Sequence, residues 1–256
     1  MILAIDIGNT NIAIGCIDGD DVSNVFFLST ITAKTADEYA VDLKNLLEFH
    51  SFSTKTISGA IISCVVPPLT EVVRKAIMLL AGVEPIVVGA GVKTGMNILI
   101  DDPAQLGGDM VATAVGALAK YPPPLIIIDL GTAINICVID RKGSFIGGAI
   151  APGVSLSMNA LSAGTSQLPT VQIEAPAKCI SANTIDCMKS GAVFGTASMI
   201  DGMAKRIEVE LSDKATVIAT GGHAAIICEH CSRDVIYDPN LVLHGLGAIY
   251  KKNTRP

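Results

Sequence analysis

The sequence holds 256 residues, half of them hydrophobic, and carries a formal net charge of −6. This length and apolar content predict one large domain or two half-sized ones around a substantial core. The acidic balance argues against a nucleic-acid partner. No apolar run is long enough to span a membrane and no signal-peptide pattern is evident, so we expect a soluble, cytoplasmic protein without a membrane partner.

Two short patterns suggest chemistry that the sequence does not support. The seven cysteines, an odd number, are scattered through apolar segments and predict reduced core thiols rather than disulfides. CEHC at residues 228–231 lacks a second ligand pair at zinc spacing. VVGAGVKTG at residues 87–95 departs from the spacing of both the dinucleotide fingerprint and the P-loop, so it predicts a connecting loop.

The first predicted element is a strand at residues 2–5, which is followed by Asp6 and the turn residues Gly8, Asn9 and Thr10. An acid at the end of a buried strand is costly unless something compensates its charge. Two interpretations are open at this point. The acid and the turn either bind a divalent metal and a phosphate, or they form a β-hairpin turn with a surface aspartate.

Strands and helices then alternate along the chain. A capping-box pair, Thr35 and Glu38, predicts a helix over residues 35–49. Apolar periodicity and turn residues predict further strands at 59–66 and 85–88 and helices at 69–82 and 109–120. This alternation predicts an α/β protein with parallel strands and crossover helices.

An internal repeat is the most informative feature. LIIIDLGTAINICVIDRKG at 125–143 repeats the pattern of the N-terminal ILAIDIGNTNIAIGCIDGD, with Asp129 in the position of Asp6 and Thr132 in the position of Asn9. A repeat of this length predicts two similar lobes, whose Asp-x-Gly turns would clamp a nucleotide phosphate tail from both sides.

A third glycine element supports a nucleotide site. The apolar strand before Gly221 and Gly222 leads toward a predicted helix. Glycines at such a turn allow a close approach of the backbone to an adenine and a ribose.

With these motifs the sequence resembles the type III pantothenate kinases of the actin-like acetate and sugar kinase superfamily. The matching segments run in family order over essentially the whole chain: DIGNTN (6–11), ILIDDPAQLGGD (98–109), IIIDLGTA (126–133), GGAIAPGVSLSMNAL (147–161), LPTV (168–171), NTIDCMKSGAVFG (183–195), VIATGG (217–222) and DPNLVLHGLGAIY (238–250). The resemblance implies an α/β fold of two similar actin-like (ribonuclease H-like) lobes, residues 1–115 and 116–256, with an ATP cleft between them.

The resemblance also implies an activity. It is the ATP-dependent phosphorylation of pantothenate to 4'-phosphopantothenate, the first step of coenzyme A biosynthesis. Its implied cofactors are ATP, Mg²⁺ and an activating monovalent cation, K⁺ or NH₄⁺. The implied assembly is a homodimer with the substrate site at the subunit interface.

Site residues follow from the same matches. Asp109 matches the general base, Asp129 matches the acid that binds the monovalent cation, and Asp6 is expected to hold Mg²⁺ through water. The expected ATP-binding residues are Asp6, Ile7, Gly8, Asn9, Thr10, Asn11, Thr132, Asn135, Gly221 and Gly222. The expected substrate-binding residues are Ile100, Gly107, Gly108, Asp109, Met110 and Thr184, the last reaching the partner subunit's substrate. Judged without the family, the position of Asp109 in the first turn of a predicted helix favours a structural role, and Thr184 could cap the helix that begins near Ile185.

Several site positions depart from the family pattern. Met110 stands where arginine is usual, Ile100 stands where some members have tyrosine, and Ile134, Asn135 and Cys137 replace a Thr-Thr pair and an aspartate. Losing a charge-assisted hydrogen bond to the substrate carboxylate costs about 1.5–3 kcal/mol.

Two hypotheses explain these departures. The chain is a divergent kinase, of pantothenate or of another small hydroxylated substrate, or it is a catalytically weakened paralogue that binds nucleotide or pantothenate as a regulator. The acids Asp6, Asp109 and Asp129 are kept together with Thr132, and this favours the enzyme because a pure binder needs no general base.

Overall fold

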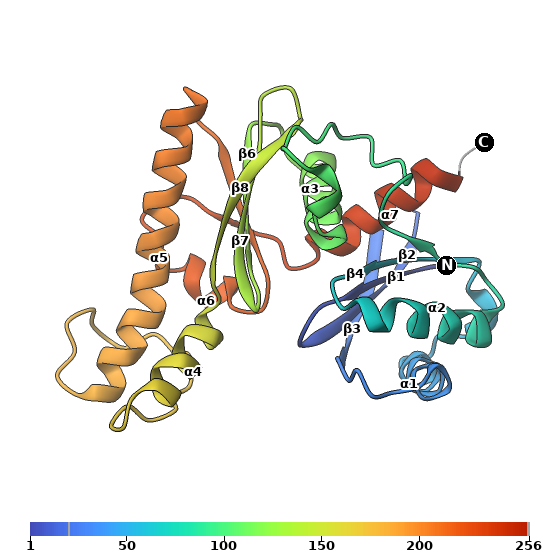
Figure 1. Cartoon of the computed structure of the whole chain (residues 1–256), viewed down its shortest axis with the longest axis horizontal. Helices are drawn as coiled ribbons and strands as arrows, with labels where there is room; N and C mark the ends of the chain where they lie inside the picture. Colours follow the sequence, from blue (N-terminus) through green and yellow to red (C-terminus); the bar gives the residue numbers. More distant parts are fainter. Residues whose placement is uncertain (20, 255–256) are drawn as a thin grey trace. The chain divides into compact units, whose positions relative to one another are not determined.

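The computed structural model describes residues 1–19 and 21–254, which form two compact units (Figure 1). The first unit comprises Met1–Met96, Asp101–Lys120 and Asn240–Pro256, and the second comprises Asn97–Ile100 and Tyr121–Pro239. The last helix of the chain therefore belongs to the first unit, whereas the sequence analysis assigned it to the second lobe. This helix, residues 241–254, belongs to the first unit because it packs against the helix at residues 108–120, which precedes the second unit in the chain.

The first unit is built on a mixed five-stranded sheet in the order β3-β2-β1-β4-β5. Its strands are β1 (Ile2–Ile7), β2 (Asn11–Asp18), β3 (Asp21–Ser29), β4 (Gly59–Cys64) and β5 (Ile86–Val87). Its helices are α1 (Ala36–Phe49), α2 (Pro67–Ala81), α3 (Gly108–Lys120) and α7 (Leu241–Thr254), with short 3₁₀ turns η1 (Thr54–Thr56) and η2 (Pro103–Gln105).

The predicted parallel pairing holds for only part of this sheet. β4 runs parallel to β1 and β5, as predicted, but β2 and β3 join β1 as an antiparallel meander. The turns that connect these first three strands are too short for a crossover, so antiparallel pairing is the available geometry.

The two faces of this sheet have different covers. Leu3, Ile5 and Ile7 pack with residues of α1 and α2 in one hydrophobic core. Because side chains alternate along a strand, Ala4 and Asp6 point to the opposite face, where α3 and α7 contact the strands (Figure 1). Asp6 thus lies on the face covered by α3, the helix that carries Asp109.

The local signals of the sequence account for the helix ends. Thr35 and Glu38 form the predicted capping box at the start of α1. Gly82 ends α2 in the left-handed conformation, with φ of 67°. Pro67 begins α2 rather than separating it from β4, since proline fits the first turn of a helix, where its missing N–H is not needed.

The second unit repeats the plan of the first. Its strands are β6 (Leu125–Leu130), β7 (Ala133–Ile139), β8 (Phe145–Pro152), β9 (Thr216–Thr220) and β10 (Ile236–Tyr237), in the order β8-β7-β6-β9-β10. Its helices are α4 (Val154–Gly164), α5 (Thr184–Leu211) and α6 (Ala224–Cys228), and they cover one face of the sheet (Figure 1). β6 pairs antiparallel with β7 and parallel with β9, as β1 pairs with β2 and β4. The predicted internal repeat is confirmed.

Two glycines let α3 and α7 pack at short range, and we expect Gly245→Ala to destabilise the chain. A Cβ on Gly245 would overlap the Ala112 carbonyl oxygen, and one on Gly116 would overlap that of Leu241. Overpacking of this kind costs about 1–3 kcal/mol, which lowers the melting temperature by about 2–10 °C. Gly202→Ala on α5 is the control, because its Cβ would enter open space. Equal melting temperatures for the two variants would contradict the predicted overlap.

Candidate active site

The first Asp-x-Gly turn joins β1 to β2 and is held by hydrogen bonds from Gly8 and Thr30. The Gly8 N–H donates to the Asn11 carbonyl (3.0 Å). Thr30 donates from its Oγ1 to the Gly8 carbonyl (2.7 Å) and from its N–H to the Thr10 carbonyl (3.0 Å). Asn9, Thr10 and Asn11 are exposed. The segment is therefore a hairpin turn whose polar groups are accessible to a ligand, but Asp6 is not a surface aspartate, since its Oδ1 is buried.

The second turn, between β6 and β7, is similar to the first but one residue shorter. The Gly131 N–H donates to the Ala133 carbonyl (3.1 Å), and the Gly153 N–H donates to that of Thr132 (3.1 Å). Thr132 itself is exposed. Thr30 and Gly153 each directly follow the third strand of their unit, a correspondence that the sequence analysis missed because it depends on strand pairing.

Asp129 lies beside the third glycine element. In the parallel pairing of β6 with β9 it is opposite Thr220, and in the antiparallel pairing with β7 it is opposite Asn135. Gly221 has a φ of 94°, and a Cβ there would lie 2.5 Å from Asp129 Oδ1. Glycine is required at this position by both the backbone conformation and the close approach.

Asp109 occupies the first turn of α3. The Gly107 carbonyl accepts from the Val111 N–H (3.0 Å), and the Asp109 carboxylate accepts from the Met110 N–H (2.7 Å). Burial raises the pKa of Asp109 above the ordinary value of an aspartate, and the Met110 hydrogen bond opposes that shift. A half-buried carboxylate with a raised pKa at a helix N-terminus is suited to accept a proton.

Other predicted site residues lie elsewhere in their units. Ile7, an expected ATP-binding residue, is fully buried in the first hydrophobic core, so its side chain is not available to a nucleotide. Ile134, one of the departures from the family pattern, is buried in the second core. The departure at Ile134 therefore affects packing more directly than phosphate contact. Ile100 belongs to the second unit, whereas Gly107, Gly108 and Met110 belong to the first. Gly222 is exposed in the turn before α6.

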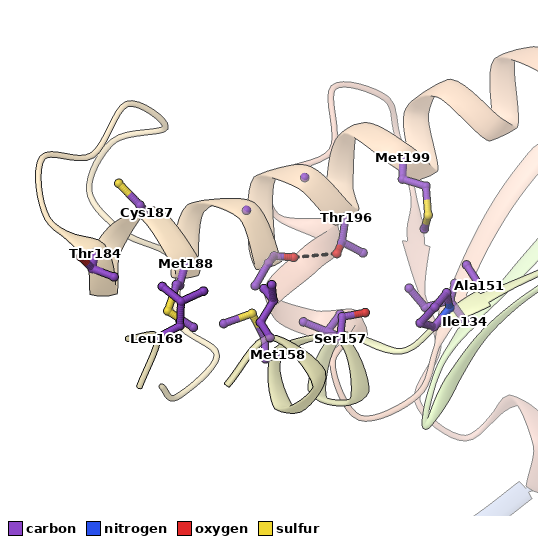
Figure 2. Close-up of a pocket in the computed structure, with 16 residues that line it drawn as sticks. Ile134, Ala151, Ser157, Met158, Leu168, Thr184, Cys187, Met188, Thr196 and Met199 are labelled. Atoms are coloured by element: carbon purple, nitrogen blue, oxygen red, sulfur yellow. Dashed lines mark hydrogen bonds between the residues drawn. The ribbon is translucent and has the colours of Figure 1, made fainter. Parts of the chain in front are cut away.

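Thr184 lies at an apolar pocket of the second unit. Its volume is about 600 Å³, and its lining comes mainly from α4 and α5. Figure 2 shows Thr184 and Cys187 at one end of this lining and Met199 at the other, with Met158 and Met188 between them. Asn183 caps α5 by accepting from the Asp186 N–H (2.9 Å), so capping does not explain Thr184.

The acidic side chains of the candidate site fit a cation that is bound jointly by the protein and by the phosphates of a nucleotide. Among the described residues, His, Cys, Asp and Glu nowhere gather in a group of three that could hold a metal by themselves. Mg²⁺ commonly uses one or two carboxylates together with substrate phosphates and water, and Asp6 beside the Gly8–Asn11 turn fits this donor set. Within residues 1–19 and 21–254, no helix has the length and apolar character needed to cross a lipid bilayer.

The fold is shared with solved structures of low sequence identity. The structure resembles the activator of 2-hydroxyisocaproyl-CoA dehydratase from Clostridium difficile with bound ADPNP (TM-score 0.55, 13% identity, 100% and 98% of the two chains). It also resembles component A of (R)-2-hydroxyglutaryl-CoA dehydratase from Acidaminococcus fermentans (TM-score 0.57, 15% identity, 99% of each chain). These similarities define an actin-like ATPase and sugar kinase fold.

Sequence comparisons specify the family within this class. The sequence-family model of the type III pantothenate kinases matches residues 2–206 of this chain. Proteins of that name from Exiguobacterium sp. and Moorella thermoacetica are 42% and 38% identical; the matches cover 100% and 99% of this chain and 100% of both relatives. The chain belongs to the type III pantothenate kinase family.

Proposed function

We propose that this chain transfers the γ-phosphoryl group of ATP to pantothenate and so makes 4'-phosphopantothenate. Full-length similarity to type III pantothenate kinases is the observation that carries the proposal. The cellular role is then the first step of coenzyme A biosynthesis. The seven free cysteines of the chain are consistent with a reducing compartment, so we assign the protein to the cytoplasm.

In the first unit, Asp109 is the proposed general base for the pantothenate hydroxyl. Phosphoryl transfer depends chiefly on positioning the reactants and on neutralising the phosphate charge. A general base assists by orienting the attacking hydroxyl and accepting its proton. Gly107 and Gly108 leave room for the substrate, and Met110 lies beside it. The Gly8–Asn11 turn contacts phosphate and Asp6 holds Mg²⁺ through water. Bound Mg²⁺ supplies positive charge to the phosphates.

In the second unit, Asp129 is the proposed ligand of the monovalent cation. Thr132 and Asn135 present a hydroxyl and an amide that donate to phosphate, while Gly221 and Gly222 approach the nucleoside with backbone alone. The similarity of this turn to the first supports the assignment, because in each unit the residue after the third strand donates its backbone N–H to a carbonyl of the turn.

We also propose a homodimer in which Thr184 contacts the substrate of the partner subunit. Support comes from the apolar pocket at Thr184 and from the exposed Leu156, Leu161 and Ile185 on α4 and α5. Apolar side chains gathered on a surface indicate an interface.

The experiment is a transfer assay with purified protein, ATP and pantothenate, combined with light scattering of the same sample. We expect turnover that disappears without Mg²⁺, rises when K⁺ or NH₄⁺ replaces Na⁺, and comes from a dimer. Absence of turnover over a wide pantothenate range would contradict the kinase and favour the regulatory paralogue. A monomer with full activity would contradict the shared site.

A further inference from the structure

Ser63 is a fully buried hydroxyl with no evident structural purpose. It is 0% exposed on β4, and among the described residues its Oγ has no hydrogen-bond partner. Buried polar atoms are nearly always hydrogen-bonded, and an unpaired one destabilises the folded state. An alanine would fill the same position at no such cost, so the hydroxyl calls for another explanation.

The surroundings of Ser63 are the residues proposed to act on substrate. In the parallel pairing of β1 with β4, Ser63 lies opposite Asp6, and paired residues of neighbouring strands share a face. On that face, a Cβ on Gly108 would lie 3.3 Å from Ser63 Oγ. The hydroxyl is therefore adjacent both to the strand position of Asp6 and to the first turn of α3, which carries Asp109.

The internal repeat provides an independent observation. Thr220 occupies the position of Ser63 in the second unit, opposite Asp129 in the parallel pairing of β6 with β9. It is also buried, at 5% exposed. Each unit thus places a small hydroxyl residue beside the acid at the end of its first strand, in a sheet whose other buried positions are mostly apolar.

We infer that Ser63 is a positioning residue whose hydroxyl hydrogen-bonds to an oxygen of the bound reactants held between Asp6 and Asp109. This inference rests on the proposed function. The oxygen comes from the pantothenate hydroxyl or from a water of the Mg²⁺ shell, since either one would lie between a cation-binding acid and a general base. Because Ser63 is fully buried beneath Gly108 in the protein alone, the contact requires the Gly108 turn to shift when the reactants bind, and the hydroxyl is then satisfied only in the complex.

The test is Ser63→Ala, which removes the hydroxyl and little volume. We expect kcat/KM to fall about 2- to 13-fold, the effect of one hydrogen bond. Because an unpaired buried group is removed, we also expect the melting temperature to stay or to rise by about 2–4 °C. Calorimetry of pantothenate and of Mg²⁺–ADP identifies the source of the oxygen: weaker pantothenate binding indicates the substrate hydroxyl, and weaker Mg²⁺–ADP binding indicates the water.

Two further variants separate this role from a structural one. Ser63→Thr keeps the hydroxyl and copies the second unit, so it should recover activity relative to Ser63→Ala. Ser144→Ala changes an equally buried serine, 3% exposed, outside the site, and should leave kcat/KM unchanged. Unchanged kinetics and binding in Ser63→Ala, while Asp109→Asn still abolishes turnover, would overturn this inference alone. Full activity in Asp109→Asn would instead overturn the proposed site.

Discussion

Asp109→Asn is expected to lower kcat about 10²- to 10⁴-fold, the usual contribution of a general base. The amide keeps the size of the side chain and an oxygen that can accept from the Met110 N–H, as the carboxylate does at 2.7 Å. What is lost is the ability to take a proton from the substrate hydroxyl. The measurement is steady-state phosphate transfer at saturating ATP and pantothenate.

A nearby acid provides the matched control. Asp101 is exposed on the segment that leads to α3, so Asp101→Asn removes the same charge without touching the proposed site. Its kcat should stay within about twofold of the wild-type value, since surface substitutions are usually near neutral. If Asp109→Asn retained a comparable kcat, the carboxylate would have no role in proton transfer.

The pH dependence of the same variant gives a second readout with a defined sign. Burial raises the pKa of Asp109 in the folded chain, so the folded state holds this proton to higher pH than the unfolded state does. The carboxyl therefore contributes stability at low pH that is lost as the pH rises through the raised pKa. Asp109→Asn should be more thermostable than the wild type at neutral pH, and the difference should vanish below the ordinary aspartate pKa of about 4. The variant thus gains stability as it loses activity.

The repeat and the two turns could be predicted because their signals are local. Apolar runs that end in Asp-x-Gly recur in the sequence, and the structure gives both copies the same strand order. The placement of α7 in the first unit could not be predicted in this way. It depends on Gly245 and Gly116, which permit close packing between helices far apart in sequence.

The missed residues have a common physical reason. Ser63 acquires its neighbours only through the register of β4 against β1, and Thr30 only through the return of β3 to the first turn. Conversely, Ile7 and Ile134 stand inside the predicted motifs, but strand alternation turns their side chains into the cores. A motif locates the backbone of a site, whereas pairing and alternation decide which side chains face it.

Met110→Arg is expected to lower KM for pantothenate about 10- to 150-fold, with a smaller change in kcat. Met110 is half-buried in the first turn of α3, directly after Asp109. An arginine there restores the family pattern and can form a charge-assisted pair with the substrate carboxylate, worth about 1.5–3 kcal/mol. Because a cation also lowers the pKa of a neighbouring carboxyl, the acid limb of the pH–rate profile should move to lower pH.

The effects of side-chain charge and side-chain size at position 110 on KM can be separated by a second variant and a second substrate. Met110→Leu conserves volume without charge and should leave KM near the wild-type value. The alcohol analogue of pantothenate, which lacks the carboxylate, should gain nothing from Met110→Arg, because the introduced guanidinium then has no anion to bind. An equal gain on both substrates would show that the arginine acts through packing or through Asp109 instead. No gain on either would mean that this chain binds the carboxylate elsewhere, and that Met110 belongs to a rearranged site rather than a weakened one.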